Sequence, residues 1–161
     1  MNIAPADKVV ITAQAPTIEK PIVCNGWPSV FPANFRAVMR LDGTVNAERA
    51  RAALIDAILR VQSELSDWLA ASNQAGTATF NSAVADDPQI DDLPSRAHHY
   101  IGAVYCYAAA KLNDRMANFD ATHQGMNRAD ETLPSTHTLE RDGLAHIRAI
   151  KGAPSGDVEL L

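Results

Sequence analysis

The stretch from residue 46 to residue 73, NAERARAALIDAILRVQSELSDWLAASN, decides the fold class. Its apolar side chains recur three and four residues apart, which is the spacing of one helix face: Ala50, Leu54, Ala57, Ile58, Val61, Leu65, Trp68 and Leu69. Charged side chains, among them Arg49 and Arg60, project from the opposite face. Thr44 or Asn46 can cap the first turn. The pattern predicts one continuous amphipathic helix over residues 46–73.

A second long helix is predicted from Ser95 to Phe119. Apolar side chains lie on one of its faces (Ile101, Val104, Tyr105, Ala108, Leu112, Phe119) and also on the other in the middle turns (Ala103, Cys106, Tyr107, Ala110). A helix that is apolar all round is either central in its own domain or packed against another chain. We expect both to contribute.

Two weaker helices complete the predicted bundle. A short one runs from Pro32 to Leu41, with proline in the first turn, where its missing N–H costs nothing. The last one ends at Gly152, and Pro134 and Gly143 are expected to interrupt it; its apolar arc consists of Leu139, Leu144, Ile147 and Ile150. Residues 74–93 read as a long connection. The fold class is therefore all-α, a small bundle of about four helices over residues 32–151.

Residues 1–31 are predicted to form an extended N-terminal arm, because five of the nine prolines fall within the first 32 residues. The β-branched clusters at residues 9–12 and 22–23 can pair as a hairpin, which is marginal in water unless it lies on another surface. The arm is either a disordered terminus or a docked segment, and Trp27 and Phe31 favour docking. Residues 152–161 form a second extended segment, the C-terminal tail.

Composition excludes several classes of function. The net charge of −5 and the pI near 5.4 argue against a protein that binds nucleic acid by neutralising its phosphates. No window approaches the roughly 18 apolar residues that span a bilayer, so no membrane association is expected. Cys24 and Cys106 form no spaced ligand set, and we expect buried, reduced thiols in a reducing cytoplasm.

The chain shows no motif for catalysis, for a metal or for a cofactor. His98 and His99 are adjacent and point about 100° apart on a helix, so they cannot chelate one ion. The other histidines lack ligand partners at suitable spacing. The acidic run at residues 86–92 lacks the glycine and the closing glutamate of a calcium loop and reads as a solvated turn. Apolar, extended termini on a helical core are instead typical of a subunit of a larger assembly.

The order of residues resembles the phage head completion protein family of temperate contractile-tailed phages. The likeness covers most of the chain, except the connection at residues 74–93 and the last helix around Pro134 and Gly143. Met39-Arg40-Leu41 followed by Thr44-Val45 is its most telling stretch. The other matching positions are Val9-Val10-Ile11, Pro21-Ile22-Val23, Phe31-Pro32, Tyr100, Ala103-Val104, Ala108, Leu112, Arg115, Ala129-Asp130, Ser135-Thr136 and Arg141-Asp142.

The resemblance implies a structural virion protein of the phage neck, assembled in the bacterial host cytoplasm. It implies a homo-oligomeric ring of about a dozen copies, bound to the portal protein after DNA packaging. Such a ring retains the genome and presents a platform for the tail completion protein. Packaged DNA would pass through its channel without sequence-specific binding.

Candidate contact residues follow from these expectations. By similarity with connector rings, Val158, Leu160 and Leu161 of the tail are expected to insert into the portal. The remaining candidates for portal or subunit contacts are Val9, Ile11 and Trp27 in the arm and Ala103, Tyr107 and Ala110 on the helix from Ser95. Two alternatives stay open: a transient, terminase-associated DNA-packaging factor, and an enzyme of unfamiliar kind on a helical scaffold.

Overall fold

The computed structural model describes residues 20–41, 45–72, 79–120 and 134–152. In these residues it has six helices and one two-stranded antiparallel sheet. They are α1 (Pro32–Val38), α2 (Ala47–Glu64), α3 (Ser66–Ser72), α4 (Phe80–Ala83), β1 (Gln89–Ile90), β2 (Leu93–Pro94), α5 (Ser95–Asp120) and α6 (Thr136–Lys151). The predicted all-α class is confirmed. None of the described helices has the length and apolarity needed to cross a membrane.

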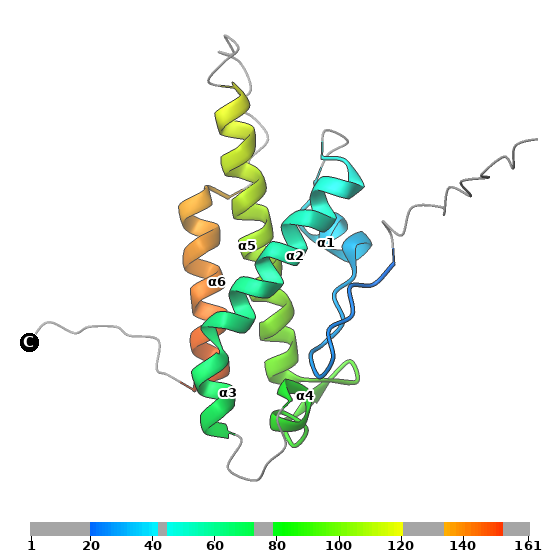
Figure 1. Cartoon of the computed structure of the whole chain (residues 1–161), viewed down its shortest axis with the longest axis vertical. Coiled ribbons are helices and arrows are strands. Elements are labelled where there is room, and N and C mark those ends of the chain that lie inside the picture. Colours follow the sequence, from blue (N-terminus) through cyan, green and yellow to red (C-terminus); the bar gives the residue numbers. More distant parts are fainter. Residues whose placement is uncertain (1–19, 42–44, 73–78, 121–133, 153–161) are drawn as a thin grey trace, which may run out of the picture.

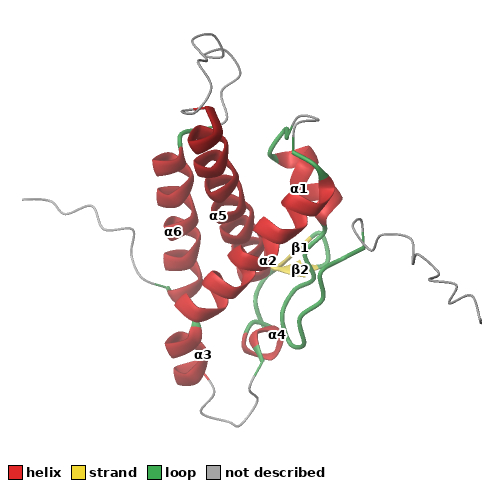
Figure 2. Ribbon diagram, turned by 45° about the horizontal axis from the view of Figure 1, so that its top comes forward, coloured by secondary structure: helices red, strands yellow, loops and turns green. Residues whose placement is uncertain are grey.

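Helix α5 is the centre of the bundle. Helix α6 lies along one side of it, α2 crosses it, and α1 with the loops lies on the side away from α6 (Figures 1 and 2). The middle turns of α5 are consequently buried all round, from Ala103 to Ala110. Of the two interpretations of its apolar pattern, a central place in its own domain is the one that the structure realises.

Helix α2 begins and packs as predicted but ends earlier. The Asn46 side chain accepts a hydrogen bond of 2.8 Å from the backbone N–H of Arg49. The predicted apolar face from Ala50 to Val61 is buried. The helix nevertheless ends at Glu64, and the Ser66 hydroxyl donates to the carbonyl of Ser63 at 2.8 Å. Such local side-chain bonds compete with the helical ladder and bend helices, so the single predicted helix is wrong at this point and becomes α2 and α3.

Glycines allow α5 and α6 to approach closely. A Cβ atom on Gly143 would lie 2.5 Å from Cε1 of Tyr107, and one on Gly102 would lie 2.7 Å from Nε2 of His146. Gly143 therefore does not interrupt the last helix, contrary to the prediction, but is buried within an unbroken α6. The helix starts after Pro134, as expected, with Ser135 as its cap.

The apolar arc of α6 is mostly confirmed. Leu139, Ile147 and Ile150 are buried, whereas Leu144, which was placed in the same arc, is 39% exposed. The helix ends at Gly152, which adopts the left-handed conformation with φ of 68°. This conformation is common at helix ends and is least costly for glycine. The predicted end of the helix is therefore confirmed.

The described part of the arm docks on the bundle. Ile22 and Val30 exchange two backbone hydrogen bonds, of 2.7 and 3.0 Å, and both side chains are buried. Trp27 stacks on Phe80 with 4.9 Å between ring centroids and lies 5.2 Å from the Tyr100 ring. The core thus includes residues from Ile22 onward, before the expected boundary at residue 32. Residues 9–12, the other half of the predicted hairpin, lie outside the described residues.

The predicted long connection contains ordered structure before α5. Strands β1 and β2 form a tight hairpin whose two turn residues, Asp91 and Asp92, have φ of 48° and 59°. Positive φ at both central residues is typical of a two-residue hairpin turn, which Asp tolerates better than most residues. Asp91 and Asp92 thus occupy the solvated turn that was predicted from the acidic run.

Candidate functional site

The structure describes only some of the predicted contact residues. Val9 and Ile11 of the arm and Val158, Leu160 and Leu161 of the tail lie outside the described residues. Trp27 is half-buried in the aromatic cluster with Phe80 and Tyr100.

The three candidates on α5, Ala103, Tyr107 and Ala110, are all buried inside the domain. Helices α2 and α6 cover the middle of α5, so these side chains are not on the surface of the single chain. Their contact with another subunit stays a prediction. In this conformation their direct role is to hold the bundle together.

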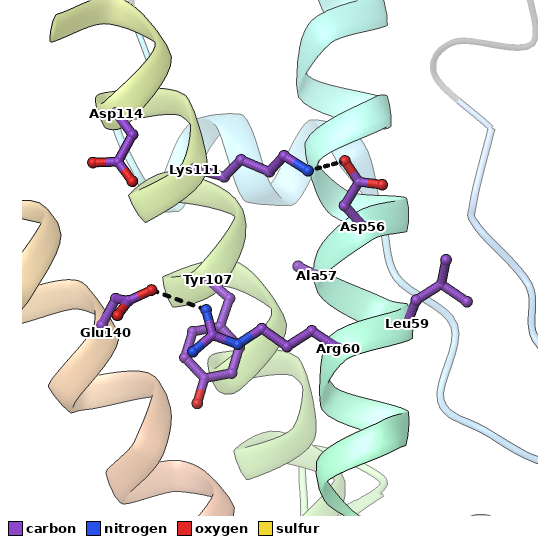
Figure 3. A pocket seen from close by; sticks show the side chains of 8 residues that line it. All are labelled: Asp56, Ala57, Leu59, Arg60, Tyr107, Lys111, Asp114 and Glu140. Carbon is purple, nitrogen blue, oxygen red and sulfur yellow. Dashed lines mark hydrogen bonds and ion pairs between the residues drawn. The ribbon is translucent and has the colours of Figure 1, made fainter. Parts of the chain in front are cut away.

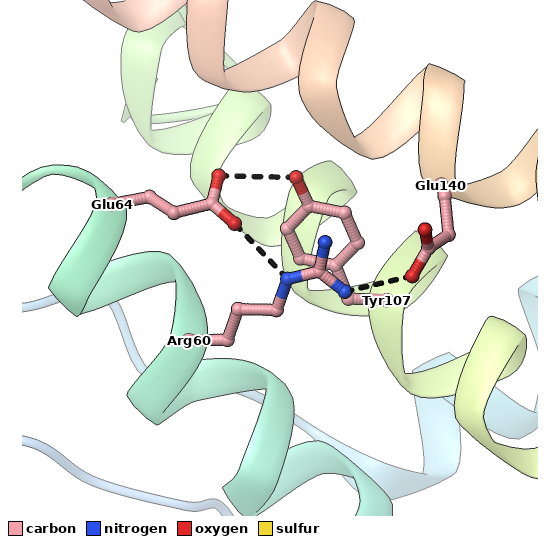
Figure 4. A network of polar contacts seen from close by, with 4 residues as sticks. All are labelled: Arg60, Glu64, Tyr107 and Glu140. Carbon is pink, nitrogen blue, oxygen red and sulfur yellow. Dashed lines mark hydrogen bonds and ion pairs between the residues drawn. The ribbon is translucent and has the colours of Figure 1, made fainter.

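A network of polar groups joins three helices on the surface (Figure 4). Arg60 of α2 donates to Glu64 at 3.0 Å and to Glu140 of α6 at 2.9 Å. Its guanidinium lies 3.8 Å from the centroid of the Tyr107 ring, and the Tyr107 hydroxyl donates to Glu64 at 3.1 Å. Burial raises the pKa of Tyr107 to about 12, so the phenol stays protonated at neutral pH. The network therefore joins α2, α5 and α6.

The same network closes one end of a polar cleft of 470 Å³ between α2, α5 and α6 (Figure 3). Its cations pair with its carboxylates, Arg60 with Glu140 and Lys111 with Asp56. A catalytic site needs a nucleophile next to a base, or a converging set of ligands. The paired charges of this cleft form neither. No group of three metal-ligating side chains occurs in the described parts of the chain.

Two histidines that the sequence placed apart meet between α5 and α6. Nδ1 of His99 lies 3.0 Å from Nδ1 of His146, so one imidazole donates and the other accepts. Burial, with a smaller contribution from His99, lowers the pKa of His146. The pair is thus a packing contact between α5 and α6, next to Gly102. The sequence pattern did not indicate this contact, because 47 residues separate the two histidines.

An apolar groove of 710 Å³ lies on the side of α5 that faces α1, and we call it the α1–α5 groove. Its lining comes from residues 27–31, α1, α4, the β1–β2 hairpin and the first half of α5. Phe31, Val38 and Leu93 line it and are 46, 63 and 37% exposed. Large apolar side chains gathered at an exposed concave site indicate an interaction surface.

Hydrogen bonds hold the walls of this groove in place. Arg96 of α5 donates through Nε to Asp87 at 2.6 Å and also forms a second bond to the same carboxylate. His98 lies 2.7 Å from the carbonyl of Ile90, and the Tyr105 hydroxyl donates to the carbonyl of Phe31 at 3.3 Å. These bonds tie the segments around the groove to α5. The sequence pattern does not indicate the groove, because its walls come from five separate segments.

The chain is similar to a known family of proteins and to a characterised relative. The family described as "Phage head completion protein (GPL)" matches residues 24–161. The head completion/stabilization protein of Escherichia phage P2 is 29% identical over 141 residues, which cover 86% of this chain and 82% of that protein. No solved structure matches.

Proposed function

Because the chain belongs to the phage head completion protein family, we propose that it forms a ring below the portal of a tailed phage after DNA packaging. The ring of about a dozen copies retains the packaged genome and offers the surface to which the tail attaches. The observation that carries this proposal is the family match over residues 24–161, a range that includes every described helix.

The described surface supports a place in an assembly. A head-to-tail ring needs two different contact surfaces on each subunit. The chain exposes apolar side chains in the α1–α5 groove and, separately, at Ile55 and Leu59, which lie one turn apart on α2. Leu59 lies at the edge of the cleft that the paired charges Arg60 and Glu140 also line. A protein that acts alone has little use for two such surfaces.

Charge and the chain ends provide the remaining support. A net charge of −5 favours passage of DNA through a channel over binding to it, since like charges repel. We assign Val158, Leu160 and Leu161 to contact with the portal protein, and the opposite side of the ring to the tail completion protein. The tail is apolar at these positions and follows the end of α6 at Gly152.

A depletion experiment tests the proposed function. Host cells infected by a phage that cannot make this protein should accumulate packaged heads that lose DNA and carry no tails. Supplying the wild-type chain from a plasmid should restore infectious particles, and the protein should then be present in purified virions. Normal yields of tailed particles without the protein would contradict the proposal, and its absence from finished virions would favour a transient packaging factor.

A further inference from the structure

We propose that the α1–α5 groove binds residues 8–12 of the N-terminal arm of a second copy of this chain. The inference rests on the proposed function, because a ring brings the arm of one copy next to the groove of another. It assigns a specific contact to a surface and a segment that the family match leaves unassigned.

The chemistry of the groove selects an apolar, extended occupant. Its floor includes Ala97, Ile101 and Tyr105, and its rim carries the exposed Val38 and Leu93. Ile90, which is paired with Leu93 in the hairpin, adds another exposed apolar side chain beside it. Residues 9–12, Val-Val-Ile-Thr, supply a short run of β-branched side chains that prefers an extended backbone. Such a run can fill a groove with alternate side chains.

Charge distinguishes the arm from the other apolar end of the chain. Asp91 is the only carboxylate among the described residues that line the groove. Lys8 is the only charged side chain within residues 8–12, with Asp7 just before them, whereas Asp157 and Glu159 lie among the apolar residues of the tail. A lysine beside Asp91 is attractive and further carboxylates are repulsive. The groove therefore favours residues 8–12 over residues 157–161.

The proposed ring, rather than the reach of the arm, selects a second copy over the same chain. Arg51 of α2 donates a hydrogen bond of 2.7 Å to the carbonyl of Lys20, so the arm joins the domain beside α2. No described residue of α2 lines the groove. Residues 13–19 extend roughly 25 Å at most, which is long enough to reach a neighbour. Ile22 pairs with Val30, next to the groove-lining Phe31, so the arm of the same chain is the competing occupant. An arm that enters the groove of a neighbour instead forms a head-to-tail contact, and such contacts close into rings.

Photo-crosslinking of the full chain tests this contact. Val10 is replaced by p-benzoylphenylalanine, which leaves Val9 and Ile11 unchanged. The protein is mixed with an ¹⁵N-labelled copy, incubated with and without the portal protein, irradiated and digested. We expect crosslinks from the arm to the groove, around residues 91–101, with peptides of mixed isotope content. Crosslinks within one isotope only, crosslinks elsewhere, or none under either condition would overturn the proposal.

Matched variants link the crosslink to the groove. Leu93→Asp should reduce the mixed-isotope crosslinks at least roughly tenfold, because it buries a charge against the apolar segment. Leu144→Asp is the control, since Leu144 on α6 has nearly the same exposure, 39% against 37%, and does not line the groove. Both variants should keep the helical circular dichroism of the wild type. Equal crosslinking by the two variants would contradict groove binding.

The outcome separates this inference from the proposed function. If the protein is required for tailed particles but the expected crosslinks do not form, the proposed ring is retained and the arm–groove contact is wrong. If the crosslinks form but tailed particles assemble without the protein, the arm–groove contact is supported and the role in head completion is wrong. Asp91→Asn, which keeps a residue suited to positive φ, should weaken crosslinking only about two- to threefold, as expected for an exposed ion pair.

Discussion

The contact between Gly143 and Tyr107 allows a sharp test of the close packing of α5 and α6. The perturbation is Gly143→Ala, which adds one methyl group in the middle of α6. Its Cβ would lie 2.5, 2.7 and 3.1 Å from three atoms of the Tyr107 ring. That ring cannot move freely, because its hydroxyl bonds to Glu64 and Arg60 lies over its face. The helices or the ring must therefore shift.

Two opposing effects determine the magnitude. Replacing glycine with alanine inside a helix stabilises it by about 1 kcal/mol. Overpacking a well-filled core costs about 1–3 kcal/mol, and the restrained Tyr107 ring places this site in the upper half of that range. We expect a net loss of about 1 kcal/mol in the free energy of unfolding. For a domain of this size the midpoint of thermal unfolding should fall by about 2–6 °C.

The assay is urea unfolding followed by circular dichroism, with two further variants. Ala145→Gly, at an exposed position on α6, measures the helix term alone and should cost about 1 kcal/mol. In a Tyr107→Leu background, which removes the ring atoms, Gly143→Ala should become stabilising by about 1 kcal/mol. If Gly143→Ala stabilises the otherwise wild-type chain by the full helix term, the close approach of α5 and α6 is wrong.

Three further predictions follow from the structure. His146 binds a proton less readily in the folded chain than in the unfolded chain, so the free energy of unfolding should fall as the pH drops below about 6.5. His146→Gln should reduce this pH dependence in urea unfolding. The exposed His137→Gln is the control and should leave it unchanged. Asp87→Asn should lower the free energy of unfolding by about 1–2 kcal/mol at neutral pH, because it weakens the bonds of a mostly buried carboxylate to Arg96. Asp86→Asn, at an exposed position, should leave the free energy of unfolding unchanged. Deleting residues 158–161 should weaken portal binding in a pull-down without changing the thermal midpoint; unchanged binding would contradict the assignment of the tail.

Local sequence patterns predicted the main helices well. The Asn46 cap, the buried face of α2, the span of α5 and the stop at Gly152 all depend on residues within one or two turns of each other. Capping bonds and helical periodicity are set by such short-range geometry. The resemblance in residue order likewise predicted the family that the comparison then found.

Features that depend on tertiary contacts were not predictable in this way. Gly143 is unfavourable for a helix by propensity, and only the Tyr107 ring opposite it explains its presence in α6. The end of α2 at Glu64 depends on a serine hydroxyl whose choice of partner the periodicity does not encode. Periodicity also placed Leu144 in the buried arc, because it does not say how far the neighbouring helix extends around α6.

The candidate site was predictable only in part. Sequence analysis identified the apolar arm and the docking role of Trp27, whose ring packs on Phe80. The α1–α5 groove could not be derived, because residues as distant in sequence as Phe31 and Leu93 form it together. The apolar pattern on α5 indicated an interaction surface at Ala103, yet the bundle buries that residue. Exposed apolar side chains lie at other positions, among them Phe31, Leu93 and, on α2, Leu59. The contact at Ala103 with another subunit stays a prediction.

The central claim is that this protein forms a ring in the phage neck. A cryo-electron microscopy reconstruction of the neck of purified virions tests it most directly. We expect a closed ring of α5-centred bundles directly below the portal, with the tail attached on its other side. A neck in which the portal contacts the tail with no density for this fold would contradict the proposed ring.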